Sequence, residues 1–162
     1  SVTHWTTQET AKMALVTSLY VVITIFLAVI SFGAVQIRLS EMFNYLALYN
    51  ERYIWAVTLG VAIANLASLN GLIDVVVGSS CTFFVLLINH QLTKRMKQLK
   101  SKMVVTAIVF ALSMFTVAGQ LTILYDLPFF YNWLVIGIGE LISMTVGGII
   151  IYMIGEKIDL TK

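Results

Sequence analysis

Long apolar runs are the feature that most constrains how this chain folds. Five runs, each near the length of a bilayer crossing, occupy about residues 12–35, 54–69, 72–93, 103–125 and 129–154. A transmembrane helix needs roughly 20 consecutive apolar residues, because each residue adds about 1.5 Å. Charged residues make up 11% of the chain, whereas a typical soluble domain has roughly 25%. The sequence therefore predicts an all-α integral membrane protein, organised as a single membrane domain over residues 1–162.

The number of helices depends on a weaker amphipathic stretch at residues 39–49. Loops rich in Lys and Arg stay on the cytoplasmic side of a membrane, and the basic loop 94–102 (KRMKQLKSK) has no acidic residue. Lys12 shares that side only if an even number of crossings separates it from the loop, so residues 39–49 count as a short helix. We therefore expect six transmembrane helices with cytoplasmic N and C termini. A five-helix alternative would place Lys12 outside.

The expected helix at 39–49 is too short to cross a membrane. Its eleven residues make a helix of about 16 Å, whereas the hydrocarbon core is about 30 Å thick. Because unpaired peptide groups are not tolerated against lipid, this helix must be buried by protein or joined to irregular backbone that lines a cavity. We expect residues 33–41 to form an outer loop that dips into the protein and residues 49–53 to form a tight inner turn. The Glu51 and Arg52 pair in that turn is typical of an interfacial anchor.

Acidic residues are concentrated in the outer half of this topology. One base, Arg38, lies there with four acids, which are Glu41, Asp74, Asp126 and Glu140. A charged residue at a helix centre costs about 2.5–3.5 kcal/mol, so each needs a partner or a function. A cavity with negative potential and low-dielectric walls concentrates cations. The charge pattern therefore predicts an outer cavity that binds a cationic or strongly hydrogen-bond-donating ligand.

One face of the last expected helix combines three residues that suit a flat ligand. Trp133, Gly137 and Glu140 lie at i, i+4 and i+7, and hence on one face. An aromatic plane, a missing side chain and a carboxylate together predict a slot for a flat heterocycle. The alternative is that Trp133 belongs to the interfacial aromatic belt and that Gly137 is a helix-packing glycine.

Further polar groups approach the outer half from other helices. Asn70 and Gly71 form a turn signal just before Asp74, which either complements the helix dipole or contacts the ligand. The amides of Asn65 and Gln120 either bind the ligand as well or form hydrogen bonds between helices. The candidate binding residues are Arg38, Glu41, Asn65, Asn70, Asp74, Gln120, Trp133, Gly137 and Glu140.

The sequence lacks the motifs of an enzyme or of a self-contained ATP-driven pump. It has two histidines without an HExxH spacing, no G-x-S-x-G elbow and no G-x-x-x-x-G-K-[ST] phosphate loop. The one cysteine, Cys81, lies in an apolar run and is typical of a buried packing residue. We therefore expect no catalytic residue, no metal site and no cofactor. A binding subunit that takes its energy from a partner fits this pattern, and so does a stand-alone carrier.

Three short motifs lie between residues 35 and 82. They are R-x-S-E at 38–41, A-N-L at 64–66 and G-x-x-D-x-x-x-G-S at 71–79. This region resembles the signature region of the QueT family, the substrate-binding S components of energy-coupling factor (ECF) transporters for queuosine precursors. The similarity extends over nearly the whole chain and includes the acidic residue Glu140 in the last helix.

The resemblance implies a six-helix S-component bundle in the bacterial plasma membrane. It implies that the ligand is 7-aminomethyl-7-deazaguanine or a relative such as queuine, captured from outside the cell. The implied partners are the lipid bilayer, a membrane T component and two ATPase subunits, with no nucleic acid. The alternative is a stand-alone membrane carrier or receptor for another cationic heterocycle or vitamin.

The resemblance also implies a docking face on the first helix. S components dock on the T component through small residues there, typically Ala-x-x-x-Ala. Ala14 and Ser18 match this pattern, with Ser at the second place. The alternative is that both residues pack within the six-helix bundle.

Overall fold

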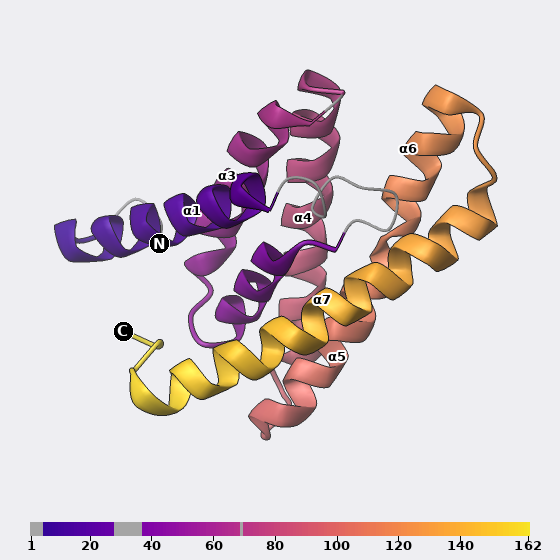
Figure 1. The fold of residues 1–162 in the computed structure, drawn as a ribbon. Coiled ribbons are helices and arrows are strands. Elements are labelled where there is room, and N and C mark those ends of the chain that lie inside the picture. The colour runs from indigo at the N-terminus through magenta and orange to yellow at the C-terminus, as the bar shows by residue number, and fades with distance from the viewer. Residues whose placement is uncertain (1–4, 28–36, 69) are drawn as a thin grey trace.

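The computed structural model describes residues 5–27, 37–68 and 70–162, and all regular structure in these ranges is helical (Figure 1). The elements in chain order are α1 (Thr7–Phe26), η2 (Leu39–Leu48), α3 (Tyr53–Ala64), η3 (Asn65–Ala67), α4 (Leu72–Thr93), α5 (Leu99–Ser113), α6 (Phe115–Tyr125) and α7 (Phe129–Lys157), where η denotes a 3-10 helix. The prediction of an all-α fold is confirmed over these ranges.

Four helical segments in the described ranges are long and apolar enough to cross a membrane. They are α1, α4, the stretch Leu99–Tyr125 that α5 and α6 form together, and α7. A shorter apolar segment, Tyr53–Ala67, combines α3 with η3. These lengths are consistent with the expected membrane protein. The count of six crossings and the cytoplasmic side of both termini remain predictions.

The first helix begins earlier than its apolar run. The Thr6 hydroxyl accepts a hydrogen bond from the Glu9 N–H at 3.1 Å, and the Glu9 carboxylate accepts one from the Thr6 N–H at 3.4 Å. This reciprocal capping box satisfies two N–H groups that a helix start leaves unpaired. It therefore starts α1 at Thr7, before the apolar run expected from about residue 12. The expected end of this helix, residues 28–35, lies outside the described residues.

The second half of the chain follows its apolar runs with one interruption. α5 begins at Leu99, within the basic segment, and Met114 separates it from α6. α6 ends at Tyr125, and Asp126 follows as its C-cap with a left-handed φ of 56°, a conformation that Asp adopts more readily than most residues. Pro128 then precedes α7 with a φ of −63°, which its ring favours. The turn between the last two helices therefore follows from these two residues.

η2 is the short helix that the sequence expects protein to bury. Residues 40–47 are all buried, and α7 packs along them (Figure 1). A Cβ on Gly147 would collide with Met42, so the missing side chain admits η2 against α7. The Tyr45 hydroxyl donates to the carbonyl of Met144 at 2.7 Å. Of the two arrangements expected for this segment, the structure shows burial by protein.

α1 packs along α3 and directs one tyrosine toward η2. The Thr17 hydroxyl donates to the Ala56 carbonyl at 2.9 Å. A Cβ on Gly60 would lie 2.9 Å from the Cβ of Tyr20, so the two helices approach closely there. Tyr20 is fully buried, and its hydroxyl reaches the acidic side chain at the start of η2.

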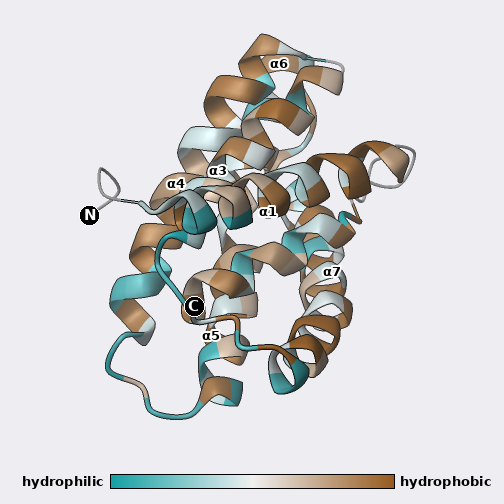
Figure 2. Ribbon diagram, turned by 90° about the vertical axis from the view of Figure 1, so that its left-hand side faces the viewer, coloured by the Kyte–Doolittle hydropathy of each residue, from teal (hydrophilic) through white to brown (hydrophobic). Residues whose placement is uncertain are grey.

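One end of the bundle gathers several segments that are distant in sequence. Arg52, in the turn before α3, forms an ion pair with Glu9 at the start of α1. A carboxylate oxygen of Glu51 lies 3.5 Å from Nε2 of His90, near the end of α4. The Tyr53 hydroxyl donates to a carbonyl of the C-terminal tail at 2.9 Å. Figure 2 shows hydrophilic residues on the α4–α5 connection and along that tail. The start of α1, this turn, the end of α4 and the tail thus share one end, as the expected topology requires.

Candidate substrate-binding site

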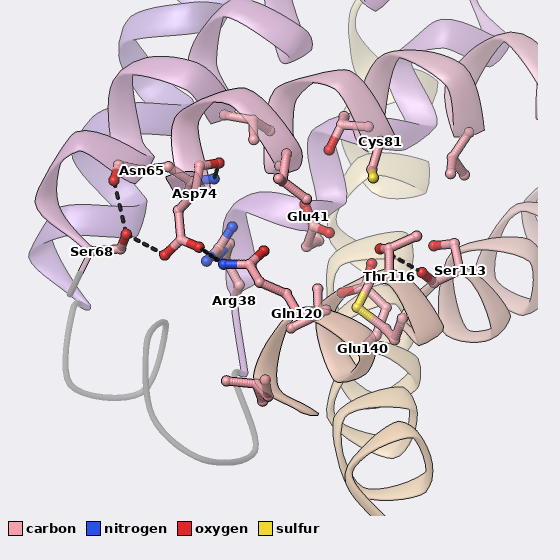
Figure 3. A pocket seen from close by; sticks show the side chains of 18 of the residues that line it. Arg38, Glu41, Asn65, Ser68, Asp74, Cys81, Ser113, Thr116, Gln120 and Glu140 are labelled. Carbon is pink, nitrogen blue, oxygen red and sulfur yellow. Dashed lines mark hydrogen bonds between the residues drawn. The ribbon is translucent and has the colours of Figure 1, made fainter. Parts of the chain in front are cut away.

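A cavity of about 190 Å³ lies among η2, α3, α4, α5, α6 and α7. Seven of the nine candidate binding residues line it, namely Arg38, Glu41, Asn65, Asn70, Asp74, Gln120 and Glu140. Its apolar walls include Val61, Val77, Val85, Phe110, Met114, Val117 and Leu121. Figure 3 shows Asp74 and Gln120 pointing toward each other across it. Residues from distant parts of the chain therefore meet at a single site.

Asp74, which is partly exposed, is the centre of a hydrogen-bond network in the cavity. Gln120 Nε2 donates to its Oδ1, and the Ser68 hydroxyl donates to its Oδ2 (Figure 3). The Asn65 side-chain amide donates to the Asp74 main-chain carbonyl at 2.9 Å. This network joins the end of α3 to α4 and α6. Both carboxylate oxygens of Asp74 are therefore already engaged by protein donors.

A glycine on α4 leaves the space that Asn65 occupies. A Cβ on Gly78 would collide with the Asn65 amide nitrogen. The glycine of the 71–79 motif therefore gives space to the asparagine of the 64–66 motif. The Oδ1 atom of Asn65 is buried and accepts no hydrogen bond from the residues that the structure describes. This acceptor is therefore available to a ligand donor.

Two carboxylates and a guanidinium form the deep end of the cavity. Glu140 is 2% exposed and Glu41 is 8% exposed. Both side chains line the cavity together with Arg38, and the Arg38 main-chain N–H donates to the hydroxyl of Ser143, one turn along α7 from Glu140, at 3.0 Å. The Tyr20 hydroxyl donates to Glu41 Oε2 at 2.9 Å. The Oε2 atom of Glu140 is buried and has no hydrogen-bond partner among the described residues.

The cavity has an excess of acidic groups. Its lining includes the carboxylates of Glu41, Asp74 and Glu140 and the single guanidinium of Arg38. Low-dielectric walls strengthen the resulting negative potential, which attracts cations. No group of three or more His, Cys, Asp or Glu residues suited to a metal ion occurs in the described ranges. The arrangement therefore suits a small organic cation with hydrogen-bond donors.

Trp133 and Gly137 do not line the cavity, so the structure does not bring the predicted face of α7 together there. The Trp133 indole N–H donates to the Leu112 carbonyl at 3.0 Å, and its ring lies 5.6 Å from the Phe129 ring between centroids. A Cβ on Gly137 would lie 3.2 Å from the Ala111 carbonyl oxygen. This part of α7 packs against α5 and against the rings of Phe115, Phe129 and Phe130. Of the three residues on the predicted face, Glu140 lines the cavity. These contacts favour the alternative that Trp133 and Gly137 are packing residues, and a ligand slot on this face remains a prediction.

Cys81 requires a correction. It is only partly buried and lines the cavity, so its interpretation as a buried packing residue is wrong. Helical spacing could have indicated this, because Cys81 lies at i+7 from Asp74 and i+3 from Gly78, on the same face of α4.

Other lining residues had no sequence signal. Ser113 and Thr116 donate to carbonyls of their own helical region, at 2.7 and 2.9 Å, as hydroxyl residues commonly do in helices. Tyr125 is 50% exposed at the outer end of the cavity, where its hydroxyl donates to the Asn70 side chain. Their positions depend on how α5 and α6 pack against α4, which no local pattern specifies.

Ala14 and Ser18 lie on an exposed face of α1. Both are exposed, as are their apolar neighbours Leu15 and Leu19. The Ser18 hydroxyl donates to the Ala14 carbonyl at 2.8 Å, within its own helix, which leaves the face apolar. The alternative that these residues pack within the bundle is therefore contradicted, and the docking role remains a prediction.

Comparison with known proteins agrees with the resemblance seen in the sequence. The sequence model of the QueT transporter family matches residues 10–157. The chain is 36% identical over 165 residues to the queuosine precursor transporter QueT of Lactococcus lactis subsp. cremoris (strain MG1363), an alignment that covers 96% of this chain and 97% of that protein. No solved structure matches the chain. Because both matches extend over nearly the whole length, the chain belongs to the QueT transporter family.

Proposed function

We propose that this chain is the substrate-binding S component of an ATP-driven ECF importer, and that it captures a queuosine precursor from outside the cell. The proposed ligand is 7-aminomethyl-7-deazaguanine or a close relative. Membership of a transporter family supports transport, and the name of the relative supports the substrate class. One observation carries the proposal: the motifs at 38–41, 64–66 and 71–79 all contribute residues to one acidic cavity.

The size of the cavity supports a ligand as small as a single heterocyclic base. Pockets for drug-sized ligands measure about 300–1,000 Å³, whereas this cavity measures about 190 Å³. Phe110 and the valines of the wall offer apolar surface to a flat ring. A carboxylate can accept two parallel N–H bonds from the edge of a guanine-like ring. We infer that the base is bound without a ribose.

The source of energy is inferred from the motifs that the sequence lacks and from the exposed face of α1. The printed sequence has no phosphate-binding loop, so ATP hydrolysis is assigned to partner subunits. The small residues Ala14 and Ser18 on an apolar, exposed face would let a helix of the T component approach closely.

Binding and uptake by the isolated chain test this function together. In calorimetric titration of the purified protein, we expect the aminomethyl base to bind saturably without ATP, because residues of this chain form the cavity. In liposomes that contain the chain alone, we expect no accumulation of the same base. Failure to bind guanine, queuine and the aminomethyl base would overturn the substrate assignment. Concentrative uptake by the chain alone would favour the stand-alone carrier.

A further inference from the structure

Building on the proposed function, we propose that the Glu41–Glu140 pair is the subsite for the cationic group of the ligand. We further propose that the pair holds one proton in the empty protein, and that the arriving cation replaces this proton. The cavity offers two acidic places for a ligand cation, Asp74 and the deep pair, and they differ in their hydrogen bonding.

Asp74 is the less suitable place, because its acceptors are in use. Its Oδ1 accepts from Gln120 and its Oδ2 accepts from Ser68 (Figure 3). Asp74 is also partly exposed, so water screens its charge. A cation placed there would have to compete with two protein donors and with solvent.

Glu140 offers what Asp74 lacks. It is 2% exposed, and its Oε2 is buried without a hydrogen-bond partner in the part of the chain that the structure describes. A buried, unpaired carboxylate oxygen is costly and gains most from a charged donor. An ammonium group carries three donors, so it can satisfy this oxygen and still reach the adjacent Glu41.

The balance of charges at the deep end indicates that the pair of carboxyl groups holds one proton. Glu41 and Glu140 are both buried and line the same cavity as Arg38. If both carboxyl groups were ionised, two negative charges would face a single guanidinium. With that proton the pair carries one negative charge, which the positive charge of Arg38 balances. An uncompensated charge is expensive in a buried site. Neutrality is therefore kept after the ammonium arrives only if the proton leaves.

The other ionisable groups around the pair do not change this count. Tyr20 on α1 donates to Glu41, and Tyr45 on η2 donates to the carbonyl of Met144, one turn along α7 from Glu140. The remaining ionisable lining residues are Asp74 and Cys81 on α4 and Tyr125 at the end of α6, and none of the cavity lining from α3 or α5 is ionisable. Residues 28–36 contain no charged amino acid.

The exchange is balanced in protons and charge. One O–H bond of the protonated carboxyl breaks, and its proton passes to the solvent. The ammonium group stays protonated, since an alkylamine such as that of lysine has a pKa of about 10.4, and it takes the place of the proton between the carboxylates. Protons stabilise the empty state only, so a lower pH must weaken binding of the cation.

Proton release is measured by calorimetric titration of the purified full chain in buffers of different ionisation enthalpy, repeated across pH. For the aminomethyl base we expect about one proton released per ligand bound, and affinity that rises by up to about tenfold per pH unit while the empty pair is protonated. Guanine, which lacks the ammonium group, should release no proton, and its affinity should not depend on pH in the same range.

Two variants assign the proton to the pair. In Glu140→Gln an amide replaces the shared proton, so proton release should vanish and the affinity for the aminomethyl base should fall by about ten- to hundredfold. Guanine affinity should be unchanged in this variant. Glu41→Gln should likewise abolish proton release, which provides a second test if one variant folds poorly. In Asp74→Asn proton release should persist, and Glu51→Gln, at the opposite end of the bundle, should behave as the parent.

The outcomes separate this inference from the proposed function. Tight binding of the aminomethyl base with no proton release and no pH dependence would overturn the subsite and leave the proposed function standing. Proton release that persists in both Glu140→Gln and Glu41→Gln would also overturn it. If the base binds at no pH, the proposed function and this inference both fail.

Discussion

Gly78 has no side chain, and this leaves the space in which the side-chain amide of Asn65 lies. A Cβ there would collide with the Asn65 nitrogen, which donates to the Asp74 carbonyl at 2.9 Å. Gly78 is helical, and among the described glycines a positive φ occurs at Gly71. The requirement at position 78 is therefore for space and not for backbone freedom.

The variant Gly78→Ala tests this requirement. We expect it to displace the Asn65 amide, to lose a hydrogen bond worth about 0.5–1.5 kcal/mol, and to reduce affinity for the aminomethyl base by roughly tenfold or less. Calorimetric titration measures the change. Gly119→Ala is the matched control, because its Cβ would meet only the Phe129 ring, at 3.8 Å, and its affinity should equal that of the parent. Parental affinity in Gly78→Ala would remove Asn65 from the binding site.

The sequence could predict which residue types form the site, but not every member. Buried charge is expensive in a membrane, so Glu41, Asp74 and Glu140 needed a common explanation, and all three line the cavity. Helical spacing correctly put Trp133 and Gly137 on one side of a helix, yet it could not say what that side packs against. The contact with α5 is a tertiary feature, so helical spacing alone could not predict it.

At the scale of elements, η2 determines the geometry of the deep end, because it carries Glu41. The sequence indicated a short buried helix from its length and from the cost of bare peptide groups in lipid. It did not indicate a 3-10 helix of ten residues, which is long for this tightly wound form. The interruption at Met114 between α5 and α6 was equally unmarked, since the apolar run continues through it.

The variant Gly147→Ala tests the fit between α7 and η2. Its Cβ would collide with both the side chain and the main chain of Met42, so relief requires movement of the helix itself. Overpacking of this kind costs about 1–3 kcal/mol. We expect a lower unfolding temperature in detergent and weaker binding of the base, because Glu41 moves with η2. Gly119→Ala serves again as the control, and an unchanged unfolding temperature in Gly147→Ala would show that η2 can shift freely.

At the scale of the whole molecule, membership of a transporter family and four long apolar helices identify a multi-pass protein of the bacterial plasma membrane. The positions of the basic residues predicted that the start of the first helix, the 49–53 turn and the C-terminal tail share one side. The contacts of Arg52 with Glu9 and of Tyr53 with the tail bring these segments together. Which side of the membrane they face rests on the distribution of Lys and Arg.

The exposed face of α1 is proposed for docking and the cavity for ligand binding. Variants on α1 can show whether docking changes while ligand affinity does not. Ala14→Leu and Ser18→Leu add bulk where close helix approach is expected, at a cost of about 1–3 kcal/mol of interface energy. Under the proposed function, the T component and ATPase subunits should co-purify with the parent chain, and we expect their yield to fall roughly tenfold in these variants. Affinity for the base should be unchanged, because neither residue lines the cavity. Thr145→Leu is the matched control, an exposed hydroxyl residue on α7, and it should keep the parental yield. If Ala14→Leu and Ser18→Leu also keep that yield, the docking surface lies elsewhere on the bundle.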